Sequence, residues 1–282
     1  MKATFIKIML CASVFVGQAQ VKTPMPSPKA TNQQVVGLTN VTVEYSRPGV
    51  KGRKIFGDLV PFGKLWRTGA NKNTTISFDQ AITVGKTTIP AGTYALFTKP
   101  NKKNWEVILY KDASNWGTPR QWDDSKVVMS TSVAVKTLAN SVETFAIDFR
   151  DIHNEGASLV FSWENSQVSL PFTVNTNEVV LQSIEANMVK NPKAKDYYNA
   201  ANYFLEHNLD LQKAEQWIEK ANQMTEKKPR YWYLRKQALI YAKNGKKKAA
   251  IEVAQKSILH AEKADNQEYV KMNQASLKEW GA

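Results

Sequence analysis

Cysteine is nearly absent from this sequence. Among 282 residues the only one is Cys11, which lies in an N-terminal stretch that we expect to be removed. The mature chain is therefore predicted to hold no disulfide, no thiol nucleophile and no thiolate metal site. Histidine is almost as scarce, because His153, His207 and His260 lie far apart and without H-x-H or H-E-x-x-H spacing. The sequence thus predicts no metal site.

Long hydrophobic runs are missing as well. Residues 1–20 begin with basic residues, continue with an apolar run at residues 8–16 and end on the small residues Gly17 and Ala19. This order is typical of a secretory signal peptide, and the apolar run is too short to span a bilayer. We therefore expect residues 1–20 to be cleaved and the protein to be exported to the periplasm, the outer membrane or the exterior. No later segment reaches the roughly 18 apolar residues of a transmembrane helix.

Recognisable catalytic motifs are also lacking. The GKTT at residues 85–88 has no earlier glycine of a phosphate loop, the DIHNEG at residues 151–156 lacks the acidic ligands of a calcium loop, and no G-x-S-x-G is present. Neighbouring carboxylates, as at Asp123 and Asp124, would serve a retaining glycosidase only at about 5 Å from each other. The sequence therefore predicts no cofactor and favours binding over catalysis.

Acidic residues are outnumbered, 25 against 38 lysines and arginines, which gives a formal charge of +13. The excess is shared between the two halves of the chain, so neither half is a basic tail. A basic exported protein attracts anionic glycans, lipid headgroups or other anions. Export makes nucleic acid an unsuitable partner, and we expect none.

The first half of the sequence is β-patterned. A Pro-rich stretch, TPMPSPKA, predicts an extended linker over residues 21–34. From residue 35 to 175, apolar residues alternate with polar ones, most clearly in TFAIDFR at residues 144–150. LVFSWE and VSLPFTV are expected to form a closing hairpin. Many short antiparallel strands without helices predict an all-β sandwich or a partly closed barrel.

The pattern becomes helical at residue 176 and stays so to residue 282. Two segments align when Ala214 is set on Ala250, an offset that is typical of helix-turn-helix repeats. The second copy resembles a tetratricopeptide repeat through Ala238, Tyr241 and Ala250, although the usual closing proline is missing. We expect an all-α repeat domain that docks a protein partner.

The stretch YSRPGVKGRKIFGDLVPFGKLWRTGAN, residues 45–71, is dense in Gly, Pro and basic residues. So many breakers predict a long structured loop, and such loops on a sheet scaffold are usually functional. In one hypothesis its arginines converge on an anion above an aromatic floor. In the other they tie the loop down by bonding backbone carbonyls and Asp58 or Glu44, while Phe56, Phe62 and Trp66 fill the core.

These residues also resemble a family. The motif Y-S-R-P-x-V-K-G-R-x-I-F-G-x-L-V-P-x-G-x-x-W-R-T-G-A-N, followed by I-P-A-G-T-Y-x-L-F-T, W-x-V-I and Asn115-Trp116-Gly117, is similar to that of an uncharacterised family of exported bacterial proteins. Its members carry a β domain of unknown function, many with a helical extension. The resemblance implies export and a shared β scaffold, and it brings no substrate.

Taken together, the residues predict an exported, non-enzymatic binding module for an anionic small molecule or a glycan. The residues expected to bind are Arg47, Lys51, Arg53, Trp66, Arg67, Asn71, Trp116 and Trp122. Two alternatives stay open. One is a structural or assembly protein of the cell envelope, and the other is a glycan-directed hydrolase that uses Trp116 or Trp122 with nearby carboxylates.

Overall fold

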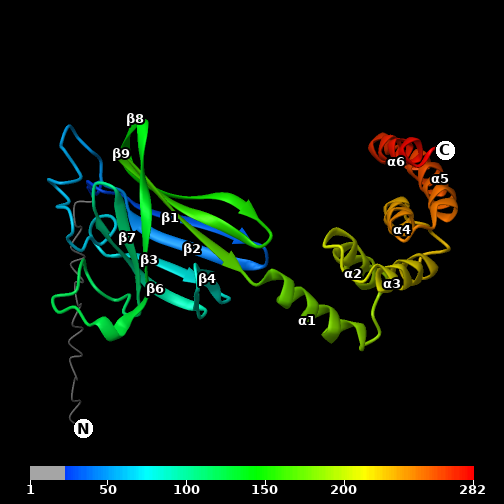
Figure 1. Ribbon diagram of the computed structural model, residues 1–282, viewed down its shortest axis with the longest axis horizontal. Coiled ribbons are helices and arrows are strands. Elements are labelled where there is room, and N and C mark those ends of the chain that lie inside the picture. The colour runs from blue at the N-terminus through cyan, green and yellow to red at the C-terminus, as the bar shows by residue number, and fades with distance from the viewer. Residues whose placement is uncertain (1–22) are drawn as a thin grey trace, which may run out of the picture. The chain divides into compact units, whose positions relative to one another are not determined.

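The computed structural model describes residues 23–282. Their contacts divide the chain into two compact units, one ending at Val174 and the other running from Asn175 to Ala282. The first unit is built of β-strands and the second of α-helices (Figure 1). The predicted fold class, a β domain followed by a helical domain, is thereby confirmed. The predicted signal peptide, residues 1–20, lies outside the described residues.

The β unit forms one antiparallel sheet in which nine strands follow the order β1-β2-β3-β6-β7-β8-β9-β4-β5 among the described residues. The strands are β1 (Lys29–Val36), β2 (Thr39–Ser46), β3 (Thr74–Phe78), β4 (Ile82–Val84), β5 (Thr87–Ile89), β6 (Gly92–Pro100), β7 (Asn104–Tyr110), β8 (Val127–His153) and β9 (Gly156–Val174). A short 3₁₀ helix, Asp124–Lys126, precedes β8.

The sheet is open and folds over on itself through its two long strands. The first part of β8 pairs with β7 and the remainder pairs with β9, so β8 passes from one layer to the other (Figure 1). Both layers contribute to one hydrophobic core, which includes the fully buried Val43 of β2 and Ile89 of β5. The alternation predicted in TFAIDFR is observed, because Phe145 and Ile147 are completely buried. Two layers around a shared core are what period-two strands with one apolar face produce.

Two details differ from the sequence-based expectation. Strand β1 begins at Lys29, so the last part of the stretch predicted as a linker, residues 29–34, belongs to an edge strand paired with β2. Its pattern was hidden because its inner positions, such as Asn32 and Gln34, are polar. The segments expected to form a closing hairpin are instead one strand, β9. The break at Glu164 is a left-handed residue (φ 51°) within the strand, which bends the pairing without reversing the chain.

The second unit is a series of antiparallel helix pairs. Its helices are α1 (Thr176–Met188), α2 (Ala194–Glu206), α3 (Leu211–Gln223), α4 (Tyr231–Lys243), α5 (Lys247–Lys263) and α6 (Gln267–Trp280). The predicted repeat is observed as the pairs α2–α3 and α4–α5, in which Ala214 and Ala250 are both fully buried. Small residues at these positions let neighbouring helices approach closely.

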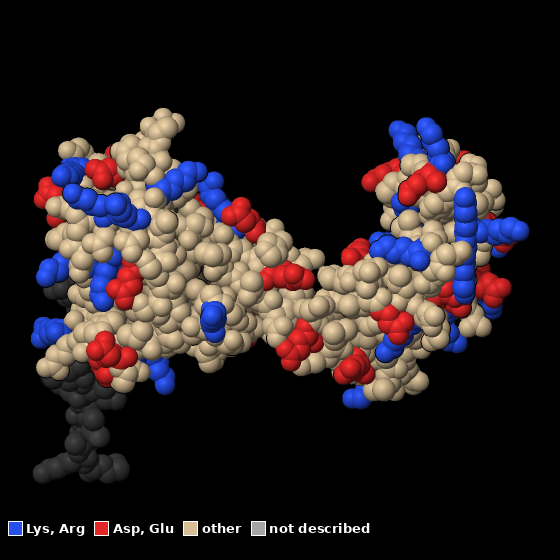
Figure 2. Space-filling model, viewed as in Figure 1, with Lys and Arg blue, Asp and Glu red and all other residues tan. Residues whose placement is uncertain are grey.

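Charge is spread over both units. On the face seen in Figure 2, lysine and arginine side chains lie among aspartates and glutamates, and no continuous basic stripe is visible there. None of the helices in the described part of the chain is both long and apolar enough to cross a membrane.

Candidate functional site

The candidate site is built on the loop of residues 47–73, which joins β2 to β3 and lies at one end of the β unit (Figure 1). Backbone hydrogen bonds hold this loop at both ends. The Val50 N–H donates to the Glu143 carbonyl (2.7 Å), and Trp66 exchanges two bonds with Thr98 of β6 (2.7 and 3.0 Å). The long loop is therefore ordered, as its Gly and Pro pattern predicted.

Aromatic side chains of the loop enter the core. Phe56 and Trp66 are buried against Trp105 of β7, Phe145 of β8 and Trp163 of β9. Trp66 lies nearly parallel to Trp163, with ring centroids 5.7 Å apart and an interplanar angle of 16°. This cluster fixes the loop to the scaffold, since each aromatic pair contributes about 0.5–1.5 kcal/mol beyond the area that it buries.

Two basic residues at the start of the loop fasten it to β8. The Arg47 Nε–H donates to the Phe145 carbonyl (2.9 Å), and the Lys51 backbone N–H donates to the Glu143 carboxylate (2.9 Å). Both contacts satisfy polar groups of the loop, in the manner of the structural hypothesis.

Arg53 and Arg67 also donate to backbone carbonyls, but their charge is left uncompensated. The Arg53 guanidinium donates to Val50 (3.0 Å) and Gly49 (2.7 Å), and Arg67 donates to Asn71 (2.9 Å). Within the described residues neither forms an ion pair, so the expected bonds to Asp58 or Glu44 are absent there. A guanidinium has five N–H groups, so donors remain available while the carbonyls hold each fork in place.

A cavity of about 350 Å³, here called the basic pocket, lies between these two arginines. Its cationic lining residues are Arg53, Lys64 and Arg67, and none of its lining residues is acidic. Trp66 and Trp163 form part of its wall. Three positive charges without a counter-charge give this pocket a strong preference for an anion.

The indole of Trp163 adds an unusual feature to the basic pocket. Its Nε1–H is buried and has no hydrogen-bond partner in the described part of the protein. Leaving such a donor unsatisfied costs about 1–3 kcal/mol.

A strained turn closes the loop. Thr68 is fully buried and has a left-handed backbone (φ 54°), which is rare for a β-branched residue, and Asn71 is also left-handed (φ 58°). Hydrogen bonds hold the turn: the Trp66 indole donates to the Gly69 carbonyl (3.1 Å), and the Thr74 hydroxyl donates to the Thr68 carbonyl (2.6 Å). Such strain persists only where the surroundings enforce it, and it concentrates at functional sites.

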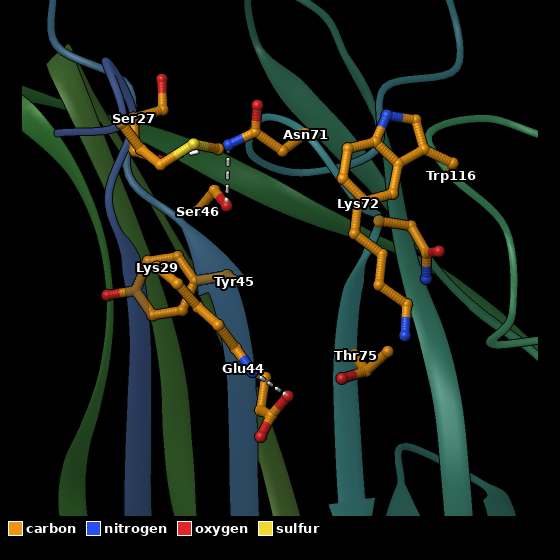
Figure 3. Close-up of a pocket in the computed structure, with 11 residues that line it drawn as sticks. Ser27, Lys29, Glu44, Tyr45, Ser46, Asn71, Lys72, Thr75 and Trp116 are labelled. Carbon is orange, nitrogen blue, oxygen red and sulfur yellow. Dashed lines mark hydrogen bonds and ion pairs between the residues drawn. The ribbon is translucent and has the colours of Figure 1, made fainter. Parts of the chain in front are cut away.

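A second cavity of about 260 Å³, here called the amide pocket, is lined by Asn71 of this turn. Figure 3 shows Trp116 and Lys72 on one side of the pocket and Ser27 and Lys29 on the other. Ser27 lines both pockets. The remaining lining residues are Met25, Glu44, Tyr45, Ser46, Asn71, Asn73 and Thr75.

The amide pocket combines an unsatisfied acceptor with an exposed aromatic face. Asn73 is buried, its Nδ2 donates to the Thr74 carbonyl (3.2 Å), and its Oδ1 has no partner in the described part of the chain. Trp116 is 75% exposed. An ion pair between Lys29 and Glu44 (2.8 Å) forms another part of the wall (Figure 3). The pocket thus offers both polar contacts and an apolar surface.

The segment that carries Trp116 is held locally and packs against Arg67, which lines the basic pocket. Asp112 accepts hydrogen bonds from the hydroxyl and the backbone N–H of Ser114, and these bonds hold the pKa of Asp112 below its usual value. A Cβ on Gly117 would lie 2.9 Å from a guanidinium nitrogen of Arg67. Because Arg67 packs against this glycine, one arginine borders both the basic pocket and the Trp116 segment.

The structure divides the predicted site residues into three groups. Those lining the basic pocket are Arg53, Trp66 and Arg67, and those lining the amide pocket are Asn71 and Trp116. Neither pocket includes Arg47, Lys51 or Trp122. Trp122 stacks on Tyr110 (4.5 Å) and donates its indole N–H to Asp124 (2.8 Å), so it serves local structure.

Three further pocket residues were missed from the sequence. Lys64 and Asn73 belong to the same Gly-rich loop and its continuation, so their position near the predicted arginines was an available clue. Trp163 belongs to β9 and looks like an ordinary core residue in its alternating segment. Only the packing of β9 against the loop brings it to the basic pocket.

Comparisons with known proteins give one match. The family described as a protein of unknown function (DUF2911) matches residues 27–172, which include both pockets apart from Met25. No curated protein and no solved structure matches the chain.

Proposed function

Because the chain belongs to the DUF2911 family, whose function is unknown, we propose its function from the site: the β unit is a binding module that holds an anionic ligand in the basic pocket. The observation that carries this proposal is the lining of that pocket, with Arg53, Lys64 and Arg67 but no acidic residue. Carboxylate, sulfate and phosphate all match the planar donor fork of arginine.

Two features favour a binding role over a purely structural one. The carbonyls that accept from Arg53 and Arg67 orient the guanidinium groups but do not neutralise them. Free donors held in place before binding lose little entropy when a ligand arrives. Trp163, whose buried indole N–H has no hydrogen-bond partner in the described part of the chain, lines the same pocket.

Replacing Arg67 with alanine is expected to weaken anion binding more than tenfold, because a hydrogen bond to a charged group contributes about 1.5–3 kcal/mol. The measurement is calorimetric titration of the intact chain with inorganic sulfate, inorganic phosphate and galacturonate. Melting temperatures of the same proteins report any loss of stability.

A matched pair of lysines separates specific binding from general attraction. Lys64 and Lys54 are both exposed residues of the loop, but only Lys64 lines the basic pocket. Lys64→Ala is expected to weaken binding about fivefold, the effect of one exposed ion pair, and Lys54→Ala to leave it nearly unchanged. A wild-type protein that binds none of the three anions, with Arg67→Ala merely destabilised, would leave the loop as scaffold.

We also propose that the protein works outside the cytoplasm. The basic, apolar and small residues of positions 1–20 support this, since they follow the order of a secretory signal. Mass spectrometry of the protein from its producing cells is expected to find a mature N-terminus at or near Gln20. Retention of Met1 in the exported fraction would contradict cleavage.

A further inference from the structure

The amide pocket has features that a simple anion would not use. Its buried acceptor, Asn73 Oδ1, needs a hydrogen-bond donor, whereas sulfate and carboxylate only accept. A donor must therefore come from a hydroxyl, an amide N–H or an ammonium group. Lys29 and Lys72 line the same pocket and disfavour an ammonium group.

The exposed ring of Trp116 limits the choice further. An indole that is 75% exposed at the edge of a pocket offers an apolar face to a ligand that also carries polar groups. A sugar ring meets both conditions, because its C–H groups can cover the indole while its hydroxyls donate to Asn73 and bond the Lys29–Glu44 pair. The volume of about 260 Å³ suits one ring rather than a long chain.

The two pockets adjoin each other, because they share the lining residue Ser27. Gly69 and Ala70 line the basic pocket, the next residue, Asn71, lines the amide pocket, and Ser27 lines both. Arg67 also links them, since its guanidinium donates to the Asn71 carbonyl (2.9 Å).

We infer that the ligand is a saccharide carrying an anionic group, with one sugar ring against Trp116 in the amide pocket and its carboxylate, sulfate or phosphate in the basic pocket. This inference rests on the proposed function. It adds the class of ligand and assigns the exposed Trp116 and the buried Asn73 to the recognition of the ring.

The experiment compares a simple anion with two tetrasaccharides by calorimetric titration of the intact chain. The probes are whichever of inorganic sulfate and inorganic phosphate binds more tightly, the acidic tetragalacturonate, and the neutral maltotetraose. Tetragalacturonate is expected to bind at least tenfold more tightly than the simple anion. Trp116→Ala is expected to abolish that gain without changing the binding of the simple anion, and Trp116→Phe, which keeps an aromatic face, to retain most of it.

Each other outcome overturns a different statement. Tetragalacturonate binding that is no tighter than that of the simple anion, or that is unaffected in Trp116→Ala, removes the amide pocket from recognition while the basic pocket keeps its role. Maltotetraose binding as tightly as tetragalacturonate shows that the ligand needs no anionic group. If no anionic probe binds, the proposed function fails and this inference fails with it.

Discussion

Replacing Trp66 with alanine is expected to lower the free energy of unfolding of the β unit by about 3–5 kcal/mol, the usual cost of deleting a large aromatic side chain from a core. Trp66 is 91% buried, since only 9% of it is exposed, and it contacts Phe56, Trp105, Phe145 and Trp163. Its removal leaves a cavity among four aromatic rings, of which Trp105, Phe145 and Trp163 are held by three separate strands, so the rings cannot collapse together.

Hydrogen exchange of the β6 and β7 amides measures the change in the free energy of unfolding of the β unit alone, because the amides of the helical unit are followed separately. Trp116→Ala is the matched control, since it removes the same side chain at a position that is 75% exposed, and it is expected to change stability by less than about 0.5 kcal/mol. A loss below about 1 kcal/mol in Trp66→Ala would show that the loop is not part of the core.

The periodicity of apolar residues predicted that the first unit is β and the second α, because that periodicity follows from the local geometry of strands and helices. Alternation in residues 144–150 places Phe145 and Ile147 on the inner face, and the helical pattern after residue 176 places Ala214 and Ala250 between helices. Each of these assignments depends on neighbours along the chain.

What the sequence could not predict depends on contacts between distant segments. Strand β1 has polar inner positions, so its pairing with β2 leaves no hydrophobic pattern to detect. The sequence around Glu164 predicts a turn between two strands. In the structure the left-handed Glu164 lies within β9, and the pairing of β9 with β8 continues on both sides of it. Sequence reasoning therefore predicted the long loop but could not predict which strands cover it.

The candidate site shows the same division. Arg53 and Arg67 were predicted together, because their spacing among glycines indicated a loop that could bring them to one anion. Arg47 and Lys51 belong to the same stretch but bond to β8. The Arg47 side chain donates to the Phe145 carbonyl, and the Lys51 backbone N–H donates to the Glu143 carboxylate. Residue type alone does not distinguish a cation that binds a ligand from a cation that fastens a loop.

Replacing Gly69 with alanine is expected to destabilise the β unit by about 3 kcal/mol or more and to weaken binding at both pockets. Gly69 has φ 151°, a conformation open almost only to glycine, and an added Cβ would lie 2.9 Å from the backbone oxygen of Ser46. Because Ser46 belongs to β2 and cannot retreat, the turn itself must move. That turn carries Asn71 and accepts the indole N–H of Trp66, so both pockets lose a wall.

Gly52→Ala is the matched control for this prediction. Gly52 belongs to the same loop and is also left-handed (φ 69°), but no atom lies within 4 Å of an added Cβ, and it lines neither pocket. It is expected to cost about 1–2 kcal/mol through its backbone alone and to leave affinity unchanged. Hydrogen exchange and calorimetric titration with the tightest-binding anion give both quantities for each variant. Equal losses of stability and affinity in the two variants would mean that the close approach of Gly69 to Ser46 does not shape the site.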